Sequence, residues 1–228
     1  KLKENYIETE LEQAMVENPT ATSGNVIIMN PQTGEILAMA TNPKYDLNSP
    51  SSYLSTGYTE DEWKALAAEE KSAALLNVWK NRSVSGTYEP GSTFKLITAA
   101  VGLEEGLVQT DTVNDFNCTG SYVVAIENDE PVEISCWRVN PHGGQTLRNA
   151  LCNSCNPAFM QLGQRIGVST LYKYFQAFGL FEPLGNDIAK SYKGIFNKLE
   201  DMGPVELATT SFGQRFEISP LQLVTAVS

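Results

Sequence analysis

The chain has 228 residues, a formal net charge of −11 and 42% hydrophobic residues. A chain of this length and composition can bury one substantial core and is not of the disordered class. The acidic charge argues against binding to nucleic acid, or to anionic lipid through a basic face, and no apolar run is long enough to span a bilayer.

The first elements expected in chain order are a helix and a β-hairpin. Apolar residues four positions apart predict an amphipathic helix over residues 1–18. Two apolar, β-prone segments, 25–30 and 35–41, flank a Pro-Gln-Thr-Gly turn and predict a hairpin. Both of its faces are apolar, so we expect it to be buried between helical layers. A polar loop over 43–57 and two helices follow, one capped by Thr59 and one over 72–78.

The segment Tyr-Glu-Pro-Gly-Ser-Thr-Phe-Lys at 88–95 joins a turn to a helix. The helix is expected to begin near Ser92 and end at Gly106, which places Ser92 and Lys95 on one face. A serine becomes a nucleophile when a base takes its proton, and a lysine with a lowered pKa can be that base. Taken alone, this spacing is common on solvated helix faces. Because the single histidine, His142, lies in a turn-forming Pro-His-Gly-Gly, lysine is the favoured base.

Residues 107–145 form the most irregular part of the sequence. Residues 122–126 are strand-like, and the acidic run 127–130 is read as a solvated hairpin tip in preference to a metal site. Cys118 and Cys136 bracket this segment and could form a disulfide in an oxidising compartment.

A helix over 146–153 leads into Ser154-Cys155-Asn156, where Asn156 is expected to cap the next helix and Pro157 to occupy its first position. The Cys-x-x-Cys spacing of Cys152 and Cys155 resembles a redox or zinc half-site, but no second cysteine or histidine pair completes one. Further helices are expected over 168–178, with Ser169 as cap, and over 204–211 and 220–228. The long loop over 180–203 is interpreted as a functional rim.

The Tyr88–Lys95 segment and the Ser154–Phe159 segment together resemble the transpeptidase domain of penicillin-binding proteins, whose motifs include Ser-x-x-Lys and Ser-x-Asn. Residues 30–39, 42–48 and 212–222 are similar to further stretches of that family, in the same order. The resemblance is strongest to the monofunctional, membrane-anchored class B members.

The resemblance implies an α/β (α+β) fold of the penicillin-binding and serine β-lactamase type, with helices around an antiparallel sheet. It implies one partial transpeptidase domain over 1–228, with 107–145 as an irregular insertion. The family's third motif, Lys-Thr-Gly or Lys-Ser-Gly, is absent from the sequence, so we expect an incomplete sheet whose last strands are missing. Arg215 stands where the family usually has glycine.

The resemblance further implies a peptidoglycan D,D-transpeptidase that forms an acyl-serine intermediate. Ser92 would be the nucleophile, Lys95 its base and Ser154 a proton relay, with Asn156 and Gln214 binding substrate. The expected partners are peptidoglycan stem peptides, β-lactams and membrane proteins of cell-wall synthesis, with no nucleic acid, metal or organic cofactor. An upstream anchor would hold the domain at the outer face of the bacterial cytoplasmic membrane. The alternatives are a β-lactamase or β-lactam sensor, and a non-catalytic scaffold for division or elongation partners.

Overall fold

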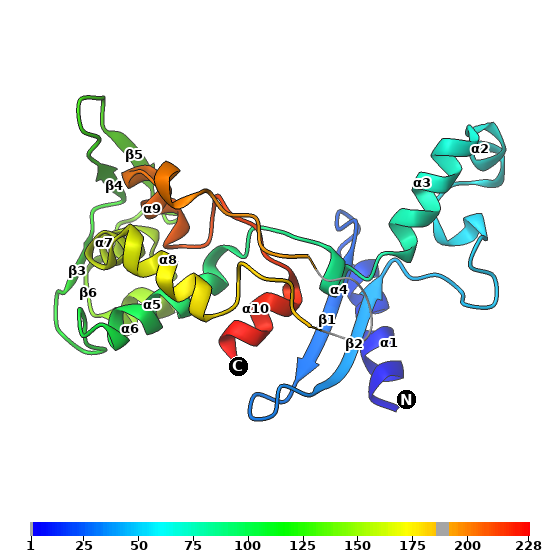
Figure 1. Ribbon diagram of the computed structural model, residues 1–228, viewed down its shortest axis with the longest axis horizontal. Helices are drawn as coiled ribbons and strands as arrows, with labels where there is room; N and C mark the ends of the chain where they lie inside the picture. Colours follow the sequence, from blue (N-terminus) through cyan, green and yellow to red (C-terminus); the bar gives the residue numbers. More distant parts are fainter. Residues whose placement is uncertain (1, 186–191) are drawn as a thin grey trace.

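The computed structural model describes residues 2–185 and 192–228, which form two halves joined near the centre of the molecule (Figure 1). The N-terminal half holds a helix, a hairpin and three further helices: α1 (Leu2–Glu17), β1 (Gly24–Met29), β2 (Ile36–Asn42), α2 (Glu60–Ala65), α3 (Ala68–Trp79) and α4 (Arg82–Ser85). The C-terminal half is mainly helical: α5 (Lys95–Glu104), α6 (Leu147–Cys152), α7 (Asn156–Ile166), α8 (Val168–Ala177), α9 (Pro204–Thr210) and α10 (Pro220–Val227). The mixed α+β class expected from the sequence is confirmed.

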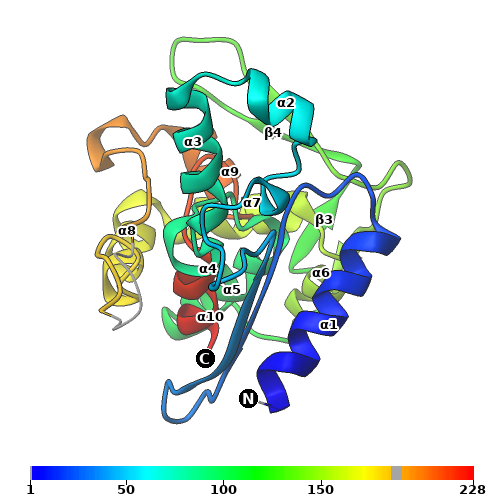
Figure 2. The same ribbon diagram turned by 90° about the vertical axis from the view of Figure 1, so that its right-hand side faces the viewer.

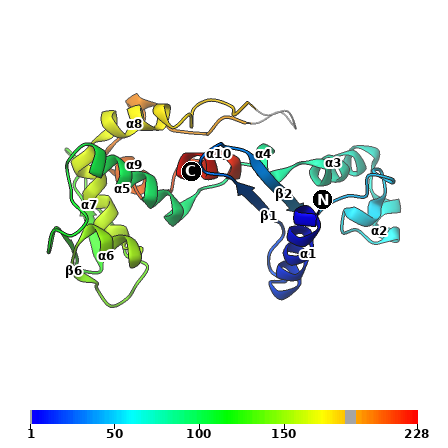
Figure 3. The same ribbon diagram turned by 90° about the horizontal axis from the view of Figure 1, so that it is seen from below.

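The predicted hairpin is confirmed, with β1 and β2 paired antiparallel from Gly24 opposite Asn42 and a register shift near Met29. Helix α1 packs along one side of it (Figures 2 and 3), and their contact buries a small apolar core. The expectation that the hairpin is buried on both faces is wrong, because much of each strand is only half-buried and Ile28 is 39% exposed. Besides α1, the short helices α4 and α10 contact the strands, and together these helices cover the two-stranded ribbon only in part.

Helices α2 and α3 extend away from the helical half (Figure 1). The predicted cap is confirmed: Thr59 Oγ1 accepts a hydrogen bond from the Glu62 N–H, and the Glu62 carboxylate accepts one from the Thr59 N–H. Helix α3 begins at Ala68, four residues before the predicted start. This peripheral pair of helices has only one buried residue, Val78.

The C-terminal half is built around α7, which packs against α5 and α9. A Cβ atom on Gly102 would lie 2.8 Å from Cδ1 of Leu162, so the close approach of α5 and α7 favours a glycine here. Three buried aromatic rings join α5 to the rest of the core: the Phe94 ring lies 5.4 Å from that of Phe175 and 4.7 Å from that of Phe216. Helix α5, which follows the turn that carries Ser92, is therefore fixed on several sides.

Residues 107–145 form two separate two-stranded antiparallel sheets. One pairs β3 (Phe116–Cys118) with β6 (Gly143–Gln145), and the other pairs β4 (Ser121–Val124) with β5 (Val132–Ser135). The acidic run 127–130 lies at the tip between β4 and β5, as predicted. Two-stranded pairs of this size have little stability of their own in water.

Several predicted helix boundaries are corrected by the structure. Ser92 lies in the 3₁₀ turn η2 (Gly91–Phe94) that precedes α5, and Cys155, not Asn156, is the N-cap of α7, with Pro157 at its second position. The cap of α8 is Gly167, not Ser169. The long loop expected over 180–203 includes residues 186–191, which lie outside the described residues, and a short turn η3 (Leu199–Asp201). In the described part of the chain, every helix is too short or too polar to cross a membrane.

Candidate active site

The turn that carries Ser92 is held from behind by the segment after α9. The Gly91 N–H donates a hydrogen bond of 2.9 Å to the Gly213 carbonyl oxygen. A Cβ atom on Gly213 would collide with the Gly91 carbonyl, and the backbone of Gly213 has φ +90°, so only glycine fits here. The contact fixes the turn so that Ser92 is exposed while Lys95 is fully buried. An exposed hydroxyl thus lies next to a buried amine.

Lys95 Nζ lies at the centre of four polar contacts. It is 3.1 Å from Ser92 Oγ, 2.9 Å from Ser154 Oγ, 2.8 Å from the Ser154 carbonyl oxygen and 2.7 Å from Asn156 Oδ1. Residues that lie about sixty positions apart in the sequence therefore meet within hydrogen-bond distance. These four residues, Ser92, Lys95, Ser154 and Asn156, are called the Lys95 cluster below.

The Ser154 turn owes its shape to the end of α6. The Ser154 N–H donates to Leu151 O at 3.0 Å, and the Cys155 N–H donates to Ala150 O at 2.9 Å. Ser154 itself has φ +49°, a left-handed conformation that is uncommon for serine and common at functional turns. This backbone conformation lets both the hydroxyl and the carbonyl of one residue contact Lys95 Nζ.

Burial makes Lys95 a candidate base. Removal from water lowers the pKa of Lys95 to about 8, and the nearby thiols of Cys155 and Cys136 oppose the shift. The Phe159 ring, centred 5.6 Å from Nζ, forms part of the apolar surroundings. A neutral amine is therefore accessible close to neutral pH, as general-base chemistry requires.

The acceptors around Nζ also determine where its lone pair can point. The Ser154 carbonyl oxygen and Asn156 Oδ1 can only accept, so they take the two N–H groups of a neutral amine. The hydroxyl groups of Ser92 and Ser154 can donate instead, and both are within reach of the lone pair. The arrangement can therefore accept a proton from Ser92 and pass one to or from Ser154.

Two residues considered at the sequence level lie outside this cluster. Gln214 is exposed, its backbone N–H donates to Thr209 O, and among the described residues no hydrogen bond links its side chain to Lys95 or Ser92. His142 contacts Cys136, with 3.7 Å between Nδ1 and Sγ, so it is engaged away from Ser92. Burial, together with the charges of Arg138 and Lys95, lowers the pKa of His142.

The sequence interpretation missed a tryptophan that supports the Ser154 turn. Trp137 Nε1 donates to the carbonyl oxygens of Asn153 and Ser154, at 3.1 Å each. The Asn153 side chain in turn donates to Gln145 Oε1 at 2.8 Å. No local motif marks these residues, because each acts across a gap of at least eight positions. Cys155 is fully buried, and burial raises the pKa of its thiol to about 12, which does not suit a nucleophile.

The family profile and the related sequences that match this chain point to the same protein family. A family profile described as "Penicillin binding protein transpeptidase domain" matches residues 24–228. The chain is 39% identical over 202 residues to stage V sporulation protein D of Bacillus subtilis, covering 89% of this chain and 27% of the relative. It is 34% identical over 163 residues to peptidoglycan D,D-transpeptidase PbpA of Mycobacterium tuberculosis, covering 70% of this chain and 31% of that protein. The chain thus spans less than a third of the length of either relative.

A solved structure shares the same fold. The transpeptidase domain of Burkholderia pseudomallei penicillin-binding protein 3 superposes with a TM-score of 0.73, covering 99% of this chain and 55% of that one. The sequences are 19% identical, so this likeness concerns the fold alone.

Proposed function

The chain belongs to the penicillin-binding protein transpeptidase family, and on that premise we propose that it is the acyl-serine part of a peptidoglycan D,D-transpeptidase. The observation that carries the proposal is the Lys95 cluster, in which a buried amine contacts an exposed serine hydroxyl and the Ser154–Asn156 turn. A relative that is 34% identical is named a peptidoglycan D,D-transpeptidase. The substrate proposed here is a peptidoglycan stem peptide that ends in D-alanyl-D-alanine.

In the proposed reaction, Ser92 Oγ attacks the carbonyl carbon of the penultimate D-alanine and Lys95 Nζ takes the hydroxyl proton. The Ser92 N–H, in the first turn of a helical segment, has no partner within that turn and would donate to the oxyanion. The C–N bond then breaks, and Ser154 relays a proton from Lys95 to the departing D-alanine amine. An amine of a second stem peptide then attacks the ester carbonyl and the ester C–O bond breaks. Ser154 and Lys95 carry the proton that this amine loses to Ser92 Oγ.

Asn156 has two parts in this proposal. Its Oδ1 holds Lys95 at 2.7 Å, and its amide nitrogen remains available to bind a substrate carbonyl. Gln214 stays a predicted substrate-binding residue. The reaction also needs a second oxyanion donor, which in the family comes from the strand with Lys-Thr-Gly, a sequence that residues 1–228 do not contain. We propose that residues 1–228 alone are inactive, since the loss of one oxyanion donor already costs about 2.7–4 kcal/mol in serine hydrolases and the lysine of the same motif is lost with it.

A β-lactam presents a carbonyl in place of the dipeptide and would acylate Ser92 by the same steps. The proposed site of action is the outer face of the bacterial cytoplasmic membrane, next to membrane proteins of cell-wall synthesis. A β-lactamase and a non-catalytic scaffold remain as outcomes of the test below.

The test is acylation by a fluorescent penicillin, with the full-length protein that contains this chain and with residues 1–228. The expected result is one adduct per full-length chain, mapped to Ser92 by mass spectrometry, and slow deacylation. Ser92→Ala should lose the adduct, while Ser169→Ala, a hydroxyl deletion in α8, should keep it.

Three results would redirect the assignment. An adduct on another residue would refute the role of Ser92. Rapid turnover of the acyl-enzyme would indicate a β-lactamase, and complete absence of acylation in the full-length protein would indicate a scaffold. Fast stoichiometric acylation of residues 1–228 alone would show that a second oxyanion donor is not needed from elsewhere.

A further inference from the structure

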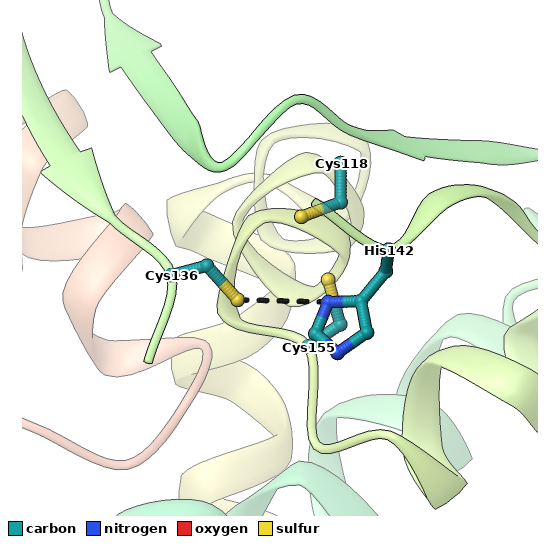
Figure 4. A group of neighbouring side chains, drawn as sticks. All are labelled: Cys118, Cys136, His142 and Cys155. Carbon is teal, nitrogen blue, oxygen red and sulfur yellow. Dashed lines mark hydrogen bonds between the residues drawn. The ribbon is translucent and has the colours of Figure 1, made fainter. Parts of the chain in front are cut away.

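Three cysteines and the single histidine come together behind the Ser154 turn (Figure 4). Cys118 ends β3, Cys136 follows β5, His142 precedes β6 and Cys155 caps α7. The three sulfur atoms and one ring nitrogen all lie within 4.8 Å of one another. All three thiols are buried and the imidazole is half-buried, whereas Cys152 is exposed and lies outside the group.

The distances suit a small tetrahedral site. With metal–sulfur bonds of about 2.3 Å and metal–nitrogen bonds of about 2.0–2.1 Å, neighbouring ligand atoms are roughly 3.6–3.8 Å apart. Cys136 Sγ and His142 Nδ1 are 3.7 Å apart. The other pairs need to close by no more than about 1 Å from the 4.8 Å limit, which side-chain rotation can supply. Figure 4 shows the sulfur atoms and the Nδ1 edge of the ring turned toward one shared space.

Disulfide formation and simple packing explain this cluster less well. The disulfide considered between Cys118 and Cys136 is not formed, because all four cysteines are free thiols. Any single bridge would use two of the three buried sulfurs and leave the third thiol and the imidazole without a function. Packing as small apolar side chains does not explain why a histidine Nδ1 lies against a buried sulfur.

A fifth side chain, that of Gln145, brings an unpaired donor to the same region. Gln145 is 3% exposed, and its Nε2 has no hydrogen-bond partner, which is costly in a protein core. The Gln145 amide lies next to the Cys155 thiol, and the backbone N–H groups of His142 and Gly120 lie next to the Cys118 thiol. Donors around sulfur ligands are typical of the surroundings of bound metals.

We propose that Cys118, Cys136, His142 and Cys155 bind one Zn²⁺ ion in a closed Cys₃His site, and that this ion positions the Ser154 turn. Soft thiolates with one imidazole in tetrahedral array favour zinc over hard cations. Four protein ligands leave no open position for substrate, so the ion is structural and not catalytic. The two-stranded pairs β3–β6 and β4–β5 are the kind of small element that a structural metal stabilises.

The site is joined to the Lys95 cluster by covalent bonds and by a hydrogen bond. Cys155 is the residue between Ser154 and Asn156, both of which contact Lys95 Nζ. Trp137 follows Cys136 and donates to the Ser154 carbonyl oxygen. An ion that holds Cys136 and Cys155 therefore holds both sides of the turn. This second half of the inference rests on the proposed function, whereas metal binding itself does not.

Metal content is the first measurement. The full-length protein, produced without a polyhistidine tag under reducing conditions, should contain one zinc per chain by elemental analysis. After chelation, Co²⁺ should restore a stoichiometric complex with the visible bands of tetrahedral cobalt and a thiolate-to-cobalt charge-transfer band.

Cys136→Ser and His142→Ala should lose most of the bound metal. Cys152→Ser, a change at the neighbouring exposed cysteine, should keep it. Less than one tenth of a zinc per chain with no tetrahedral cobalt spectrum, or a disulfide among Cys118, Cys136 and Cys155 in the reduced preparation, would overturn the site.

Acylation tests the positioning role separately. Removal of zinc should slow acylation of Ser92 by about 10–100-fold, the range typical when the support of a metal site is disturbed, and added Zn²⁺ should restore it. Equal rates with and without zinc would overturn the positioning role. Stoichiometric zinc with no acylation in any sample would refute the proposed function and leave the metal site intact, and the reverse result would refute only the metal site. Because cobalt binding is read in the wild-type chain, a variant that fails to fold does not remove the test.

Discussion

The two halves of the molecule differ sharply in how they are held together. In the C-terminal half, one continuous apolar cluster runs from Phe94 to Ile218 and includes residues of every helix from α5 to α9. In the N-terminal half, the core between α1 and the hairpin consists of Ile7, Leu11, Ala38 and Ala40. The C-terminal half therefore holds the Lys95 cluster in a closely packed frame, whereas the N-terminal half is a thin layer with one partly exposed sheet.

This difference in packing follows from the polar groups that each half must bury. A lysine that is 0% exposed is stable only where its surroundings supply acceptors at fixed positions. The Lys95 cluster meets this condition because η2, α6 and α7 are all packed against one core. The N-terminal half has no comparable buried charge among the described residues and can tolerate looser packing.

The largest effect is expected when Lys95 is changed. Lys95→Met keeps the length of the side chain and removes the base, so acylation of the full-length protein by penicillin should slow by about 10²–10⁴-fold. Lys95→Arg should fail as well, because a guanidinium stays protonated. Lys173→Met, a lysine deletion in α8, is the control and should react at the normal rate in stopped-flow fluorescence. A near-normal rate in Lys95→Met would identify another base.

A matched pair of leucine deletions compares the two cores directly. Leu162 is 0% exposed where α7 meets α5, and Leu11 is 9% exposed between α1 and the hairpin. Leu→Ala changes cost about 2–5 kcal/mol, with the larger values where the cavity cannot collapse. We expect about 4–5 kcal/mol for Leu162→Ala and about 2 kcal/mol for Leu11→Ala, measured by denaturant unfolding. Equal losses would show that the thin core is as rigid as the large one.

The same contrast explains what the sequence could and could not predict. Ser92 and Lys95 lie one turn apart, so their proximity follows from local helical geometry. The contacts of Lys95 with Ser154 and Asn156 span about sixty positions and were reached through the family motif, not through spacing.

No sequence pattern predicted the cysteine and histidine cluster, because its four ligands come from four segments and only Cys155 belongs to the Cys-x-x-Cys pair. The hairpin was predicted correctly, but its burial was not. Apolar residues on both faces of a strand indicate that it can be covered, and the layers that cover it are set by distant parts of the chain. Gln214 remains a prediction, since no hydrogen bond joins its side chain to the Lys95 cluster among the described residues.

The pH dependence of stability should reveal the buried lysine. Burial lowers the pKa of Lys95 from 10.5 to about 8. Below pH 8 the amine is protonated in both states, and the folded state bears the full cost of a buried charge. Between pH 8 and 10.5 the unfolded chain binds more protons, so the free energy of unfolding should rise with pH, by up to about 3 kcal/mol. Lys95→Met should lack this rise, so the difference between wild type and variant, from urea unfolding at several pH values, isolates it. A flat difference would contradict the lowered pKa.

The smallest expected effect concerns Arg215, which stands at a position where the related family usually has glycine. Its backbone has φ +64°, a left-handed conformation that costs a residue with a Cβ atom about 1 kcal/mol. Its N–H donates to Glu89 Oε1 at 2.8 Å, next to the turn that carries Ser92, and its guanidinium pairs with Glu206 at 2.9 Å. Arg215→Gly and Arg215→Ala both lose the ion pair and keep the N–H, so they differ only in the backbone. We therefore expect the glycine variant to be more stable than the alanine variant by about 1 kcal/mol, the reverse of the order inside a helix.

Denaturant unfolding of the two variants measures this difference. If alanine were equal or better, the turn behind Ser92 would not be held in the left-handed conformation, and the support of Gly91 by Gly213 would have to be re-examined.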